Sequence, residues 1–230
     1  MVAADVGNPG SEMDKAAVFI DQGYFEKILS YFGHQKTETL PDGKARFSNY
    51  LDYAKFSDKL CALHSSERFR TFIYDALPYK HNPPNDYESS LFAQKQRFQA
   101  YLDTQNSFLT RYGTCMVIPN KGCYFSRKRG GQPCWHITQK GVDVRFTIDL
   151  VSLSADKRVG KAILITGDSD FIPAIKYARE QNMKIILYYL KHGGTFVHPG
   201  LRSVRDEEKV VTAGLFDGCL YPKSYPAPLF

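Results

Sequence analysis

One stretch, residues 161–171, constrains the fold of this chain more than any other. A short apolar run at 162–165 stops at Thr-Gly and is followed at once by Asp168 and Asp170. Such a run is typical of a strand buried on both faces. The next residues read as a helix with a proline in its first turn, where the missing N–H is tolerated. The stretch therefore predicts a strand–loop–helix unit with two acids where parallel sheets bind ligands.

Asp168 and Asp170 allow two interpretations. Carboxylates this close repel each other, and they are tolerated best around a cation, most simply a hard divalent ion. Alternatively, Asp168 caps the helix and Asp170 lies in its first turn, where negative charge is favourable. This stretch alone does not separate the two interpretations.

A second unit of the same kind lies near the N-terminus. Residues 16–20 are apolar throughout, Asp21 ends the run, and residues 26–32 have helical spacing. Apolar runs and helical spacing predict further strands at 69–74, 115–118 and 184–190, and helices at 50–64, 87–112, 140–156 and 201–211. The alternation predicts an α/β fold, with a doubly wound and mostly parallel central sheet between two layers of helices.

Two more acids fall on the helix predicted at 140–156. Asp143 lies in its first turn and Asp149 lies six residues later, so they are about 120° apart around the helix and roughly 9 Å apart along its axis. They therefore cannot occupy equivalent places around one ion. One of them would bind the ion, and the other would act through water or cap the helix.

The segment 122–135 interleaves basic and aromatic side chains, namely Tyr124, Phe125, Arg127, Lys128, Arg129 and Trp135. A hairpin with a Gly-Gly turn fits it. Aromatic faces beside arginine and lysine bind single-stranded nucleic acid by stacking and phosphate attraction. A solvated turn with its rings in the core is the alternative. The nearby cysteines at 115, 123 and 134, with His136, match no common zinc spacing.

Composition and missing motifs exclude several classes of protein. The net charge of +6 indicates a mild preference for polyanionic partners. No run approaches transmembrane length and no segment resembles a signal peptide, so we expect a cytoplasmic protein with no membrane partner and with reduced cysteines. Walker A and Gly-x-Gly-x-x-Gly runs are absent, and Gly23 stands where a haloacid-type phosphatase needs its second acid.

The acidic motifs together resemble the NYN domain, the LabA-like branch of the PIN-like nuclease superfamily. The matching pieces are residues 19–21 with Gly23 and Tyr24, residues 140–143 with Asp149, and residues 166–171. The resemblance covers roughly residues 16–190 and implies a PIN-like three-layer α/β/α sandwich. We expect that domain to span 14–215, with insertions near 33–47 and 122–135, between a disordered or artificial segment at 1–13 and an irregular tail at 216–230.

The resemblance also implies an activity, a metal-dependent ribonuclease that uses Mg²⁺ or Mn²⁺ to hydrolyse single-stranded RNA. The implied metal ligands are Asp21, Asp149, Asp168 and Asp170, with Asp143 as a fifth catalytic acid. Many relatives have an asparagine shortly after the first acid, a place where only Gln22 supplies an amide here. RNA would be bound by Gln22, Tyr124, Arg127, Lys128, Arg129, Trp135 and Lys140.

Two other functions remain open for the same fold. An inactive RNA-binding or regulatory NYN module would bind RNA without cleaving it. A small-molecule phosphohydrolase would use the same metal on a nucleotide or a sugar phosphate. A homodimer is also left open.

Overall fold

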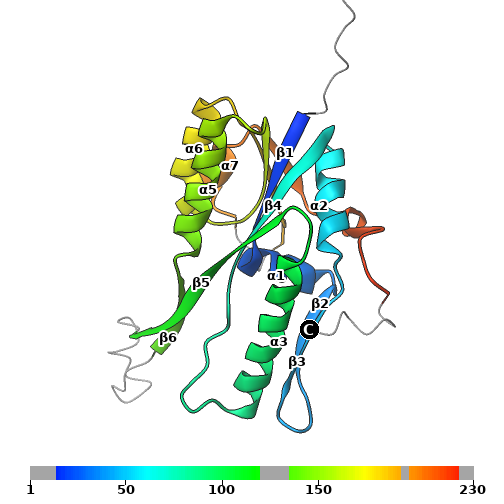
Figure 1. The fold of residues 1–230 in the computed structure, drawn as a ribbon, viewed down its shortest axis with the longest axis vertical. Helices are drawn as coiled ribbons and strands as arrows, with labels where there is room; N and C mark the ends of the chain where they lie inside the picture. Colours follow the sequence, from blue (N-terminus) through cyan, green and yellow to red (C-terminus); the bar gives the residue numbers. More distant parts are fainter. Residues whose placement is uncertain (1–13, 120–134, 193–196, 223–230) are drawn as a thin grey trace, which may run out of the picture.

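A seven-stranded sheet forms the middle of the molecule (Figure 1). The computed structural model describes residues 14–119, 135–192 and 197–222. In spatial order the strands are β6 (Trp135–Lys140), β5 (Phe108–Pro119), β4 (Ser66–Ala76), β1 (Asp14–Asp21), β7 (Lys161–Ile165), β8 (Lys184–Tyr189) and β9 (Glu207–Val210). Every neighbouring pair is parallel except β5 and β6.

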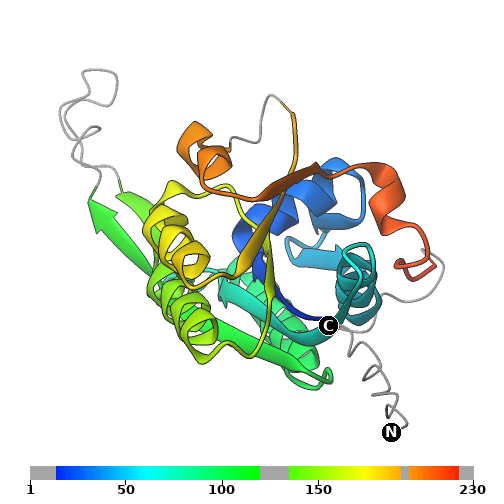
Figure 2. The same ribbon diagram turned by 90° about the horizontal axis from the view of Figure 1, so that it is seen from above.

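Helices cover both faces of this sheet and make three layers (Figure 2). The first face packs against α1 (Gln22–Tyr31), α2 (Tyr53–Ala62) and α3 (Asp86–Asp103). The opposite face packs against α5 (Val142–Asp156), α6 (Ile172–Glu180) and α7 (Pro199–Ser203). A separate apolar core lies on each face of the sheet, with Phe25 and Phe98 in the first core and Phe146 and Phe171 in the second. The predicted α/β sandwich with a mostly parallel sheet is confirmed.

The central strand β1 explains why the chain needs two cores. Val18 and Ile20 belong to the first core and Phe19 to the second, and all three side chains are completely buried. From β1 the chain continues to β4 and β5 on one side, and it later returns to β7 on the other side. The reversal of strand order lies between β1 and β7, where open α/β sheets bind their ligands.

The helix predicted over 87–112 is too long. The structure ends α3 at Asp103, and Ser107 has a positive φ of 60°. Phe108 then begins β5 and pairs with Thr71 of β4. In the sequence, Phe108 and Leu109 continue the helical spacing of the apolar residues in α3, so the pattern does not show where the helix ends.

The helix predicted over 201–211 is also wrong. In the structure, residues 199–203 form the short helix α7, and residues 207–210 form the strand β9, which pairs with β8. The strand is charged because it lies at the edge of the sheet, and Lys184 pairs with Glu207 there. Edge strands commonly carry such charges.

The polar segment 33–47 contains most of a small hairpin, β2 (Gln35–Thr39) and β3 (Ala45–Asn49). It is attached to α3, because Gln94 accepts from the backbone N–H of Phe47 at 2.8 Å and donates to the carbonyl of Ala45. Two short 3-10 helices complete the described elements, η2 (Ser169–Phe171) and η3 (Ala213–Phe216). No helix in the described parts of the chain has the length and apolar character needed to cross a membrane.

Candidate active site

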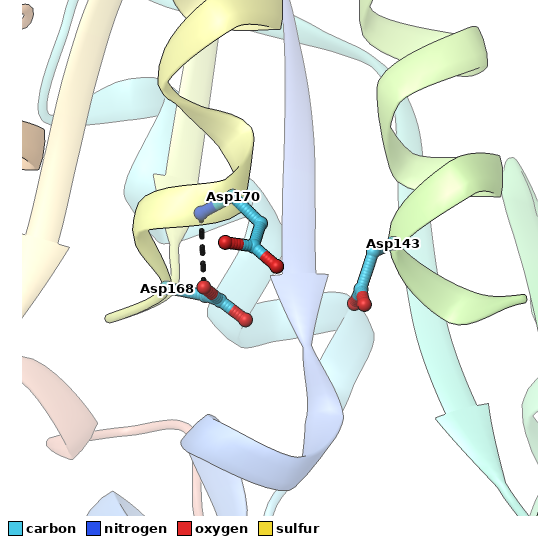
Figure 3. A group of neighbouring side chains, drawn as sticks. All are labelled: Asp143, Asp168 and Asp170. Atoms are coloured by element: carbon cyan, nitrogen blue, oxygen red, sulfur yellow. Dashed lines mark hydrogen bonds between the residues drawn. The ribbon is translucent and has the colours of Figure 1, made fainter. Parts of the chain in front are cut away.

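Three aspartates converge beside the reversal point of the sheet. Asp143, Asp168 and Asp170 each place a carboxylate oxygen within 4.8 Å of the others, and the group is accessible to solvent. Figure 3 shows them between the start of α5, which carries Asp143, and the start of α6, which follows Asp168 and Asp170. Hard divalent cations prefer carboxylate oxygens as ligands. The group, named here the acid cluster, can therefore hold such an ion.

The loop after β7 fixes two members of the acid cluster. Asp168 Oδ1 accepts from the backbone N–H of Asp170 at 2.9 Å, so Asp168 caps η2. The backbone N–H of Asp168 donates to Thr166 Oγ1 at 3.2 Å. The two sequence interpretations are therefore compatible, because Asp168 caps the turn and also lies in the acid cluster.

Asp21 lies next to the acid cluster at the end of β1. Its carboxylate accepts from the backbone N–H of Tyr24 at 3.2 Å and from the hydroxyl of Thr166 at 3.1 Å. Asp21 and Asp168 also line the same open pocket of about 580 Å³. Thr166, which is completely buried, thus links the carboxyl ends of β1 and β7 through one hydroxyl group.

The electrostatics of the site favour a cation. Burial raises the pKa of Asp21, and the negative charges of Asp168 and Asp143 raise it further. Partial burial also raises the pKa of Asp143, as do Asp168 and Asp170, while Lys140 lowers it. A raised carboxyl pKa means that the ionised form is disfavoured in the metal-free protein. A bound divalent cation would offset this repulsion.

Asp149 lies apart from the acid cluster and has a different partner. Arg111 of β5 donates to both of its carboxylate oxygens at 2.9 Å, and the hydroxyl of Tyr74 donates to one of them at 3.1 Å. The structure thus brings Asp143, and not Asp149, to Asp168 and Asp170. The helix geometry predicted that only one of the two would fit, but the choice depends on Arg111, which lies in a strand mistaken for helix.

Replacing Arg111 with methionine should lower the free energy of unfolding by about 2 kcal/mol, because Asp149 would keep a charge without its partner. The Asp149 side chain is only 13% exposed. Urea denaturation measures the change. Arg158→Met is the matched control, since its pair with Asp156 is exposed and should contribute under about 0.5 kcal/mol. Equal losses in the two variants would contradict a structural role for the Arg111 pair.

Gln22 is not placed to contact RNA. Its side chain is completely buried, and its amide donates to the Tyr53 hydroxyl at 2.9 Å. The amide therefore helps to join α1 to α2, which corrects the role expected from the resemblance.

The predicted RNA-binding segment is mostly outside the described residues. The residues that fall outside the described ranges are Tyr124, Arg127, Lys128 and Arg129, together with the cysteines at 123 and 134. Trp135 is the first residue of β6. Lys140 is exposed at the end of β6, and its charge acts on Asp143. Of the predicted basic residues, Lys140 alone is thus shown near the acid cluster within the described chain.

Gly113 sets how closely α5 approaches the sheet. A Cβ atom at this position would lie 2.5 Å from the carbonyl oxygen of Lys140 and 2.5 Å from Val142 Cγ2. Any side chain would therefore force β5 and the start of α5 apart. The sequence gives no sign of this contact, because a glycine in a strand has several explanations.

Fold and site together define an α/β protein with a cluster of three aspartates at the reversal point of its sheet. Residues 15–204 match the family model of the NYN domain, so the chain belongs to the NYN domain family. This family is in general one of PIN-like nucleases. No match was found among the curated proteins. The resemblance drawn from the acidic motifs is thereby confirmed.

Proposed function

We propose that this protein is a metal-dependent ribonuclease that hydrolyses phosphodiester bonds of single-stranded RNA with Mg²⁺ or Mn²⁺. The observation that carries the proposal is the acid cluster, in which three carboxylates meet within 4.8 Å. Partial burial, together with repulsion from Asp168 and Asp170, raises the pKa of Asp143, so the cluster has an electrostatic reason to bind a cation. Membership of the NYN family supports nuclease chemistry at this position.

Each acid has a role in the proposed reaction. Asp143, Asp168 and Asp170 would hold the ion, and Asp21 would complete its surroundings directly or through water. When bound there, Mg²⁺ or Mn²⁺ would supply an activated water near neutral pH and would neutralise charge on the attacked phosphate. Thr166 fixes the position of Asp21 relative to Asp168, since its hydroxyl is hydrogen-bonded to both residues. In-line attack would leave a 5′-phosphate and a 3′-hydroxyl.

An RNA-binding module without turnover is the second candidate. The observation that favours it is Gln22, whose burial leaves no amide at the place where many relatives have an asparagine. This candidate predicts RNA binding that survives EDTA and yields no products. A small-molecule phosphohydrolase predicts instead that a mononucleotide or a sugar phosphate is turned over while RNA is not.

The deciding experiment is an RNA cleavage assay on the purified chain. A labelled single-stranded RNA is incubated with Mn²⁺, with Mg²⁺ and with EDTA. Shortened products with 5′-phosphates are expected with either metal and not with EDTA. Bound but intact RNA under all three conditions would reject hydrolysis in favour of the binding module.

Binding of Mn²⁺ should stabilise the protein even without substrate. At a concentration 100 times its Kd, the ion should raise the free energy of unfolding by about 2.7 kcal/mol. Asp143→Asn should remove most of this gain, because it takes one charge from the acid cluster. Asp156→Asn changes an exposed acid at the far end of the same helix and should keep the gain. Thermal denaturation with and without Mn²⁺ measures the effect, and equal gains in both variants would contradict the assignment.

A further inference from the structure

An uncharged amide lines the pocket beside the acid cluster. The pocket measures about 580 Å³, is open to solvent, and has Asp21, Asp168 and Gln139 among its lining residues. Gln139 belongs to β6, the last strand at one edge of the described sheet (Figure 1). A third part of the chain thus reaches the pocket to which β1 and the loop after β7 bring their aspartates.

The pairing of β6 with β5 places Gln139 on the same face of the sheet as the acid cluster. Gln139 is the partner of Cys115 in this antiparallel pair. Directly opposed residues of antiparallel strands have their side chains on one face. Cys115 packs against the second core, which α5 and α6 cover. The acid cluster lies between the starts of these two helices (Figure 3).

The corner between β6 and α5 is tightly built. One residue, Gly141, separates the strand from the helix, and its positive φ of 81° is a conformation that favours glycine. The carbonyl oxygen of Lys140 lies so near Gly113 that an added Cβ would come within 2.5 Å of it. Gln139 and Asp143 flank this corner, so both belong to regular elements that backbone contacts hold in place, as a precise binding site requires.

The amide of Gln139 is available to a ligand. Gln139 is exposed, and its side chain makes no hydrogen bond within the described parts of the chain. A side-chain amide has one acceptor oxygen and two N–H donors, and it carries no charge. It therefore complements a hydroxyl group, which both donates and accepts a hydrogen bond.

The position of the reacting phosphate indicates which hydroxyl this is. In the proposed ribonuclease function, on which this inference rests, the phosphate lies at the acid cluster. The ribose that carries this phosphate on its 3′-oxygen is the covalent neighbour of the phosphate, and the 2′-hydroxyl is on the adjacent carbon. The 2′-hydroxyl is also the group by which a protein distinguishes RNA from DNA.

We propose that the amide of Gln139 binds the 2′-hydroxyl of this ribose and so makes the site prefer RNA to DNA. The amide lines the pocket of Asp21 and Asp168, lies on the face of the acid cluster, and has its donors and its acceptor open to a ligand. Gln139 positions the substrate in this proposal and takes no part in bond cleavage.

The test compares binding of RNA with binding of DNA of the same sequence. Fluorescence anisotropy of labelled single strands is measured in Ca²⁺, a hard divalent ion that carboxylates bind, and a gel checks that the strands stay intact. The wild type should bind RNA more tightly than DNA. Gln139→Met keeps the length of the side chain and removes the amide. It should weaken RNA binding about fivefold, the effect of one hydrogen bond, and leave DNA binding unchanged.

Gln96→Met is the matched control, because Gln96 is exposed on α3 and does not line the pocket. It should keep the affinities of the wild type for both strands. Both replaced side chains are exposed, so the melting temperatures should not change. In the cleavage assay with Mn²⁺, Gln139→Met should raise KM for RNA and leave kcat almost unchanged, as expected for a group that only positions the substrate.

The results distinguish this contact from the ribonuclease proposal. If Gln139→Met loses the preference for RNA while no protein cleaves RNA, the contact stands and hydrolysis fails. If the wild type cleaves RNA and Gln139→Met keeps the full preference, hydrolysis stands and the contact is overturned. Equal weakening of RNA and DNA binding would mean that the amide binds a group common to both strands, which also overturns it. A wild type that binds both strands equally, or neither, has the same consequence.

Discussion

Replacing Asp168 with asparagine should reduce RNA cleavage in Mn²⁺ more than about 100-fold. Loss of an outer-shell partner of a metal ligand already costs about 10–100-fold, so loss of a ligand charge should cost more. The fold should survive, because the asparagine carbonyl can still accept the hydrogen bond from the backbone N–H of Asp170. Single-turnover cleavage of a labelled RNA measures the change in rate.

Asp156→Asn is the control for this experiment, since Asp156 is exposed and lies outside the acid cluster. It should cleave RNA at the rate of the wild type. Matching melting temperatures would show that neither variant is unfolded. If Asp168→Asn retained the wild-type rate, the acid cluster would not be the catalytic site.

Asp75→Asn should stabilise the protein at pH 8, because the buried Asp75 is expensive to ionise. Asp75 is 5% exposed at the end of β4, where the side-chain amide of Gln99 donates to its carboxylate at 3.2 Å. Burial and, to a lesser extent, the charge of Glu26 raise the pKa of Asp75 from 3.8 to about 6, against the opposing charge of Lys95.

The sign of the pH dependence follows from this raised pKa. The folded state binds the proton more tightly than the unfolded state, so the stabilising contribution is complete below about pH 4 and is lost as the pH rises through about 6. Above that pH the ionised group costs up to about 3 kcal/mol, at about 1.4 kcal/mol for each pKa unit.

Urea denaturation at pH 5 and pH 8 measures this effect in the wild type and in Asp75→Asn. The advantage of the variant should be largest at pH 8 and should shrink at pH 5. The difference between the two proteins isolates Asp75 from the other acids with raised pKa values, Asp21 and Asp143, which change stability in the same direction. An advantage that does not depend on pH would show that Asp75 ionises normally in the folded protein.

The central part of the fold was predictable because its signals are local. Residues 16–20 and 162–165 are continuous apolar runs, and only strands buried on both faces need such runs. The aspartates that follow them come together because the carboxyl ends of parallel strands meet at one edge of the sheet. The acid cluster at Asp168 and Asp170 follows from this geometry alone.

The remaining site residues depend on contacts between distant segments, which local patterns do not contain. Arg111 decides that Asp149 is held away from the acid cluster, and it lies 38 residues earlier in the chain. The buried position of Gln22 depends on Tyr53, which is in another helix.

The close contact at Gly113 makes the proposed ion affinity depend on the scaffold as well as on the aspartates. A Cβ there would lie 2.5 Å from atoms of residues 140 and 142, closer than the 3.0 Å that real Cβ atoms keep. Asp143 follows directly after this contact, and metal–ligand distances are held to about 0.2 Å. A single methyl group added to β5 would thus displace one ligand relative to the others. Homologues that lack this glycine should need a different helix position, or a different ligand, to bind the same ion.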